Sequence, residues 1–249
     1  MDDDTGCPGC RAPVAFTTLG SPLAESEPIH VAGLIRGAFL ILASVVIVLV
    51  VMVAQVLLNA AGAFTPGAGS TLEIGLQGAN FLGGIAGFIG WWKFSAPDPS
   101  VTGQNRGNGS RLLIRVTVLL QMTISLGGMT LLLTSPGAVL PPPGAQAPPP
   151  SPGLLALGFA NLFLSAVWFF ASMMYLRWLA PRVPNAKVYK RAQTMLWLGP
   201  VLVVPGMCII VGPLIAVVLY WNMIYWVWKD LRTIATRQSG LDDLAPAPL

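Results

Sequence analysis

Long apolar runs make up most of this chain, and polar residues interrupt them at only a few places. Each run is at least as long as the roughly 20 residues that cross a hydrocarbon core of about 30 Å. Five such runs stand out, at about 32–59, 72–94, 112–134, 153–179 and 195–227. The pattern predicts membrane-spanning α-helices rather than water-exposed elements.

The last apolar run is too long for a single crossing. A straight helix over 195–227 would be about 50 Å long at 1.5 Å per residue, and Pro200, Pro205 and Pro213 interrupt it. We therefore divide it at Gly212-Pro213 into two spans, about 192–211 and 213–230. The alternative is one kinked helix, which would reduce the number of spans from six to five.

The basic residues provide a test of the number of spans. All 14 Lys and Arg residues lie before or at the start of the first span, between the second and third, between the fourth and fifth, or at and after the end of the sixth. The other connections, at about 60–71, 135–152 and 212–213, contain none. Because basic loops are retained in the cytoplasm, this distribution favours six spans with both termini cytoplasmic.

The composition agrees with a membrane protein, since 54% of the residues are hydrophobic and only 10% are charged. The expected fold is all-α: a polytopic transmembrane helix bundle over 32–231, located in the cell membrane. Flexible cytoplasmic tails are expected at 1–31 and 232–249. The outer loop at 135–152 contains two triple-proline runs, which predict a stiff polyproline-II arm.

The second predicted span contains a regular row of small residues. Gly75, Ala79, Gly83 and Gly87 recur every four residues and therefore share one face of the helix. In a membrane, a face of this kind lets a neighbouring helix approach closely. We expect helix packing there, and the alternative is a glycine-lined passage for a small solute.

A few uncharged polar residues lie within the predicted spans. Gln77, Asn80, Gln121 and Asn161 are the most informative of them, because an amide in lipid needs hydrogen-bond partners. One hypothesis is that they form separate contacts between helices. The other is that all four converge on a common polar cavity.

Residues that usually carry chemistry in membranes are missing from the predicted spans. None of the 10 Asp and Glu residues lies in the interior of a span, and the single histidine, His30, precedes the first one. Proton-coupled transport and metal-dependent hydrolysis both need such groups. We therefore expect no enzymatic activity.

The N-terminal segment contains Cys7 and Cys10 in a CxxC arrangement, which is half of a tetrahedral zinc site. The third cysteine, Cys208, lies in the predicted fifth span. Zinc bound by Cys7 and Cys10, shared with another copy or with further ligands, is the one cofactor that we consider. A separate basic segment, 177–191, is a candidate for contact with anionic lipid headgroups.

These patterns lead to three hypotheses about function. The first is a non-enzymatic interaction or membrane-organising protein, whose partners are the lipid bilayer and other membrane proteins or further copies of the chain. The second is a transporter or channel for a small neutral or hydrophobic solute. The third is a metal-responsive membrane sensor that uses the CxxC segment. Nucleic acid is not an expected partner.

Overall fold

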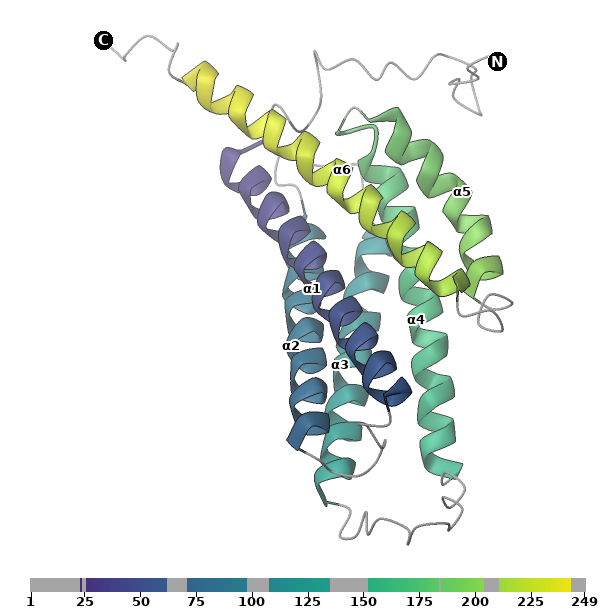
Figure 1. Cartoon of the computed structure of the whole chain (residues 1–249). Helices are drawn as coiled ribbons and strands as arrows, with labels where there is room; N and C mark the ends of the chain where they lie inside the picture. The colour runs from purple at the N-terminus through teal and green to yellow at the C-terminus, as the bar shows by residue number, and fades with distance from the viewer. Residues whose placement is uncertain are drawn as a thin grey trace, which may run out of the picture. The chain divides into compact units, whose positions relative to one another are not determined.

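The structure is a computed structural model, and it describes residues 23, 26–61, 71–97, 108–134, 152–183, 185–203 and 211–242. These ranges contain six helices and no strand, so the all-α prediction is confirmed for them (Figure 1). The helices are α1 (Pro28–Ala60), α2 (Thr71–Phe94), α3 (Asn108–Thr134), α4 (Pro152–Leu179), α5 (Ala186–Val203) and α6 (Val211–Asp242). The Pro-rich loop before Pro152 lies outside the described residues.

Three of the described helices are long and apolar enough to cross a membrane. The qualifying segments are Pro28–Ala60, Gly109–Gly127 and Gly158–Leu179, which lie in α1, α3 and α4. They indicate that the protein associates with a membrane. The other three expected spans, in α2, α5 and α6, stay predictions.

The contacts along the chain divide it into two units. The four-helix unit comprises Arg36–Ser95 and Arg111–Ala171 and contains most of α1, α2, α3 and α4. The terminal unit comprises Met1–Ile35, Ala96–Ser110 and Ser172–Leu249 and contains α5, α6 and the end of α4.

In the four-helix unit, α1 and α2 run antiparallel and pack closely between residues 37–48 of α1 and 83–94 of α2. Near one end Gly37 faces Gly90 and Phe94, and further along Gly83 faces Ile47. The rest of α1 is strongly apolar on its surface. Its exposed side chains include Val46, Val48, Val50, Met52, Val53, Val56 and Leu57. In water this surface would be unfavourable, whereas in lipid it needs no cover.

The basic residues of the four-helix unit gather at one of its ends. Arg36 lies next to Gly37, and Gly37 contacts the C-terminal end of α2 at Gly90 and Phe94. Lys93 belongs to the same end of α2, so it lies at the same level as Arg36. Arg115, near the start of α3, donates a hydrogen bond to Ser95, just after α2. Arg111 lies one turn before Arg115. Antiparallel pairing thus brings residues that are far apart in the sequence to a common level.

In the terminal unit, α5 and α6 pack against each other in antiparallel orientation (Figure 1). The side chain of Asn185, just before α5, donates a hydrogen bond to the Asp230 carboxylate in α6. One to two turns along α5, the Arg191 guanidinium lies 4.9 Å from the centre of the Trp226 ring. The last apolar run is therefore two helices folded back on each other, and the alternative of one kinked helix is wrong.

The predicted point of division in that run needs correction. Pro213 lies in the first turn of α6, and α5 ends at Val203, so the break precedes Gly212-Pro213. Proline is tolerated in a first turn because the N–H groups there have no partner within the helix. A proline near a helix boundary therefore marked the beginning of the second helix rather than the connection.

The segment 232–242, expected to belong to a flexible tail, is helical. Its apolar positions continue the buried face of α6, because Val227, Leu231 and Ile234 are all buried at helical spacing. Because charged residues separate these apolar positions, the hydrophobicity pattern alone predicted a tail.

The C-terminal end of α6 also holds the chain that precedes α1. The Gln238 side-chain amide donates hydrogen bonds to the backbone carbonyls of Leu23 and Ser26, at 3.3 and 3.0 Å. Both of these residues are buried. The described part of the predicted N-terminal tail is therefore packed, and α1 begins at Pro28.

Candidate functional site

The predicted row of small residues on α2 is divided between two environments. Gly83 and Gly87 face α1: an added Cβ would lie 3.1 Å from Ile47 Cγ2 at Gly83 and 2.7 Å from Ser44 Oγ at Gly87. Gly75 is exposed, and a Cβ there would meet no atom within 4 Å. Ala79 lies between them and is half-buried. Part of the row therefore packs on α1, and the part nearer the start of α2 is open.

The closest approach of α1 and α2 lies at a glycine that the sequence analysis missed. A Cβ on Gly37 would lie 2.6 Å from the Phe94 backbone nitrogen and 2.8 Å from the Gly90 carbonyl oxygen. A Cβ on Gly90 would lie 2.9 Å from the Ile41 backbone nitrogen. Backbone therefore meets backbone at this crossing. Gly33 and Gly37 form a GxxxG pair in the sequence, and this pattern is the signal that could have identified the crossing.

Arg115 joins the start of α3 to the end of α2. Its guanidinium donates hydrogen bonds to Ser95 Oγ at 3.1 Å, to the Ser95 carbonyl oxygen at 3.1 Å and to the Trp92 carbonyl oxygen at 3.3 Å. It also lies 4.6 Å from the centre of the Trp92 ring. The last carbonyls of a helix have no partner within it and carry partial negative charge, so a cation at this place satisfies them.

The four amide residues of the predicted polar cavity occupy different environments. Gln121 in α3 donates a hydrogen bond of 2.9 Å to Ser165 Oγ in α4, and that hydroxyl donates one of 2.8 Å to the Asn161 carbonyl oxygen. Gln121 is thus joined to the turn of α4 that holds Asn161. The side chains of Gln77, Asn80 and Asn161 are exposed. In the described structure these three amides lie on the surface of the four-helix unit.

A double-mutant cycle tests the link between α3 and α4. The variants Gln121→Leu and Ser165→Ala are expected to show a coupling energy of about 0.6 kcal/mol, typical of a hydrogen bond between membrane helices. Unfolding of the full chain in detergent micelles measures it. The matched cycle pairs Thr123→Val with Ser165→Ala and should show no coupling, because the Thr123 hydroxyl donates to Leu119 of its own helix. Equal coupling in both cycles would contradict the link.

The proposed zinc ligands Cys7 and Cys10, and Cys208, lie outside the described residues. Within the described ranges no group of three or more His, Cys, Asp and Glu residues could hold a metal ion. The zinc hypothesis therefore stays a prediction from the CxxC spacing.

Comparisons with known proteins provide no assignment for these residues. The chain matches no protein-family model, no curated protein and no solved structure. Any statement about its function therefore depends on its own helices and on the side chains that they expose.

Proposed function

We propose that the chain is a six-span membrane protein with both termini in the cytoplasm, and that it acts as a non-enzymatic interaction protein. In this proposal it recognises transmembrane helices of other proteins or of further copies of itself. The observation that carries the proposal is a set of exposed amide side chains, Gln77, Asn80 and Asn161, and we infer that they lie at membrane depth. They lie on α2 and α4 of the four-helix unit.

The depth of these amides follows from the basic end of the unit. Lys93 is near the end of α2, and basic side chains at a helix end reach the headgroups. Asn80 is about 20 Å further along α2 at 1.5 Å per residue, which is inside a hydrocarbon core of about 30 Å. Gln77 is about 24 Å from Lys93 along the same helix, which is still within the core but nearer its opposite face. This estimate takes α2 as a span, and its antiparallel pairing with the apolar helix α1 supports that view.

Exposed amides are costly in lipid. The side chains of Gln77 and Asn80 form no hydrogen bond with any described residue, although each amide offers two donors and an acceptor oxygen. Hydrocarbon cannot replace those bonds, so a polar group from another helix would stabilise this surface.

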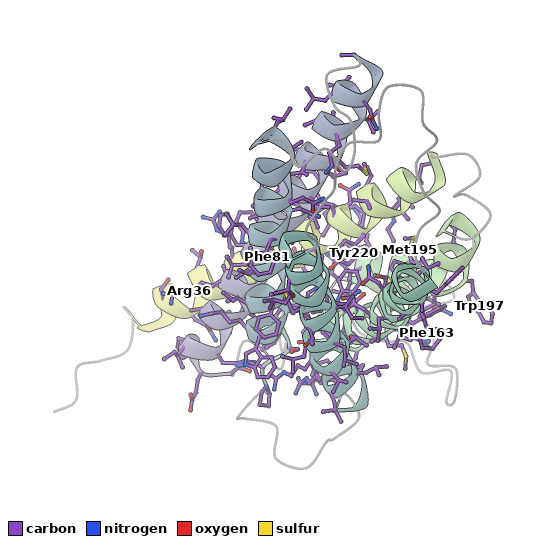
Figure 2. The ribbon with its side chains drawn as sticks, turned by 90° about the horizontal axis from the view of Figure 1, so that it is seen from below. Arg36, Phe81, Phe163, Met195, Trp197 and Tyr220 are labelled. Carbon is purple, nitrogen blue, oxygen red and sulfur yellow. The ribbon has the colours of Figure 1, made fainter. Side chains whose placement is uncertain are left out.

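A second exposed surface lies on the N-terminal half of α4. Every residue from 158 to 163 is exposed, so this stretch of the helix is covered on no face. Phe159 and Phe163 are 71% and 70% exposed, and Phe163 is labelled in Figure 2. Asn161 is exposed on the opposite face of the same stretch, so the aromatic pair and the amide offer two separate faces for the packing of another helix.

The six-span topology has its own support. The basic residues of the four-helix unit lie at one end of it, as expected if that end is cytoplasmic. The antiparallel pairing of α5 and α6 returns the chain to the side from which α5 begins. Both features favour an even number of crossings.

Site-specific photo-crosslinking in native membranes tests the proposal. A photoreactive amino acid at Asn80 or Asn161 is expected to form adducts with another membrane protein or a second copy. The matched control is Leu82, which is 63% exposed on a different side of α2 and should react mainly with lipid. Adducts at position 82 as abundant as those at position 80, or none at 80 and 161, would show that the amides bind no partner helix.

A further inference from the structure

Helix α3 has an exposed face whose residues repeat every seven positions. The spacing along this face alternates between four and three residues, which is the heptad pattern of a coiled coil. We call this face the α3 seam, and all of its residues are exposed: Leu112, Val116, Leu119, Thr123, Leu126 and Thr130. In the sequence Leu133 takes the next position of the same pattern.

The two positions of the heptad carry different types of residue. Leucine occupies one position at 112, 119 and 126, and β-branched residues occupy the other at 116, 123 and 130. Leucine at d with β-branched residues at a is typical of parallel pairs of helices. The exposed face of α1 has the same spacing, but there valine occurs at both positions, as at Val46 and Val50. Contact with lipid does not by itself require the alternation seen in α3.

The opposite face of α3 packs within the chain. Ile114 is fully buried, and Gln121 donates its hydrogen bond to Ser165 of α4. At about 100° per residue, Ile114 and Gln121 lie on the side of the helix opposite the seam. A second helix can therefore reach the seam without disturbing the contact between α3 and α4.

Neither charge nor an unsatisfied donor opposes the approach of an identical surface. The seam is uncharged, and so is its exposed flank at Leu113 and Leu120. Arg115 directs its hydrogen bonds to the end of α2. The hydroxyls of Thr123 and Thr130 donate to carbonyls one turn earlier in α3. Two copies can therefore meet along the seam without like-charge repulsion or loss of a hydrogen bond.

We propose that α3 pairs along the seam with α3 of a second copy of the chain, in parallel and in register. α3 contains one of the segments that are apolar enough to cross a membrane. Copies inserted in the same orientation have parallel α3 helices, so a two-fold axis along the membrane normal brings each seam residue to its own counterpart. The proposal goes beyond the amide surfaces of α2 and α4, because it uses another helix and names the partner.

The size of the seam indicates a reversible dimer. From Leu112 to Thr130 it is about 27 Å long, close to the thickness of a hydrocarbon core of about 30 Å. With a helix about 10–12 Å wide, the strip covers about 300 Å² on each copy. Stable soluble complexes bury about 1,200–2,000 Å² in total, so this contact belongs to the small, transient class. Insertion in the membrane already orients both copies, which lowers the rotational freedom lost on pairing.

Disulfide formation between full-length chains in native membranes tests the proposal. The background carries Cys7→Ser, Cys10→Ser and Cys208→Ser, and one further variant adds Thr123→Cys. An oxidant is expected to produce a covalent dimer, because a disulfide needs Cα atoms within about 7 Å of each other. Ser125→Cys is the matched control: Ser125 is two residues away at nearly the same depth, exposed, and on the opposite side of α3.

The result at Thr123 decides between the occupants of the seam. No dimer with Thr123→Cys, or equal dimer with Thr123→Cys and Ser125→Cys, would mean that lipid or another protein covers it and would overturn the proposal. The photo-crosslinking at Asn80 and Asn161 tests different helices. A missing disulfide together with adducts at those amides would therefore reject the seam alone, and the reverse result would reject the amide surfaces alone.

A measurement with the native cysteines in place keeps the proposal testable if that background fails to fold. Full-length chains with a donor or an acceptor fluorophore at the C-terminus are mixed in phosphatidylcholine vesicles, and energy transfer is followed as lipid is added. Leu119→Ala with Leu126→Ala is expected to lower the association constant on the order of tenfold. Leu57→Ala with Leu82→Ala removes equally exposed leucines from α1 and α2 and should leave it unchanged. Equal association of the two double variants would overturn the proposal.

Discussion

A Gly37→Ala variant is expected to lose about 1–3 kcal/mol of stability, because the added methyl group has no free space. Its Cβ would lie 2.6 Å from the Phe94 backbone nitrogen and 2.8 Å from the Gly90 carbonyl oxygen. Both neighbours are backbone atoms of a helix and cannot rotate away as a side chain can. The helices α1 and α2 must therefore separate locally, which also weakens the van der Waals contact that holds helices together in lipid.

Thermal unfolding of the full chain in detergent measures this loss. Gly33→Ala is the matched control: it lies one turn earlier on α1, and its Cβ would meet no atom within 4 Å. Alanine is favoured over glycine in a helix by roughly 0.5–1 kcal/mol, so the control is expected to be neutral or slightly stabilised. If the two variants unfold at the same temperature, the close crossing of α1 and α2 does not exist in the folded protein.

Arg115→Ala is expected to free the C-terminal end of α2 from α3, at a cost of about 2 kcal/mol. The substitution removes three hydrogen bonds and a cation–π contact and leaves the carbonyl of Ser95, a buried residue, without its charged donor. Arg115→Lys keeps the charge but cannot reach several acceptors with a planar group. We expect it to recover only part of the loss.

The measurement compares unfolding midpoints in detergent with that of Lys93→Ala. Lys93 lies in the last turn of α2, close to the same helix end, and is exposed. An exposed charge at a helix end contributes a few tenths of a kcal/mol, so this control should unfold almost like the unchanged protein. A loss in Arg115→Ala no larger than in Lys93→Ala would mean that charge near the helix end matters, and not the specific hydrogen bonds.

The helices themselves could be predicted from the sequence because each apolar run is long and ends in polar residues. The run at 72–94 corresponds to α2 at Thr71–Phe94, and the run at 112–134 lies within α3. The ends of helices could not be predicted from the apolar runs where an amphipathic segment continued the helix. The extension of α6 to Asp242 is such a case, since Leu231 and Ile234 are buried among charged residues.

The candidate site was only partly accessible to sequence reasoning. The spacing of Gly83 and Gly87 identified a face that packs closely, and the amides were recognised as residues in need of partners. The sequence did not show that Gln121 forms a hydrogen bond with Ser165 while Gln77 and Asn80 stay exposed. A hydrogen bond between helices depends on their relative register, which no local pattern contains.

The sequence by itself therefore determined which segments are apolar helices, where basic residues cluster and which catalytic groups are missing from the predicted spans. These are properties of single residues and of short-range periodicity. Only the tertiary structure decided that Gly37 meets Gly90, that Arg115 satisfies the end of α2 and that α5 folds back along α6. Each of those contacts joins residues at least 20 positions apart. They depend on how the helices pack against each other, which the local periodicity of the sequence does not contain.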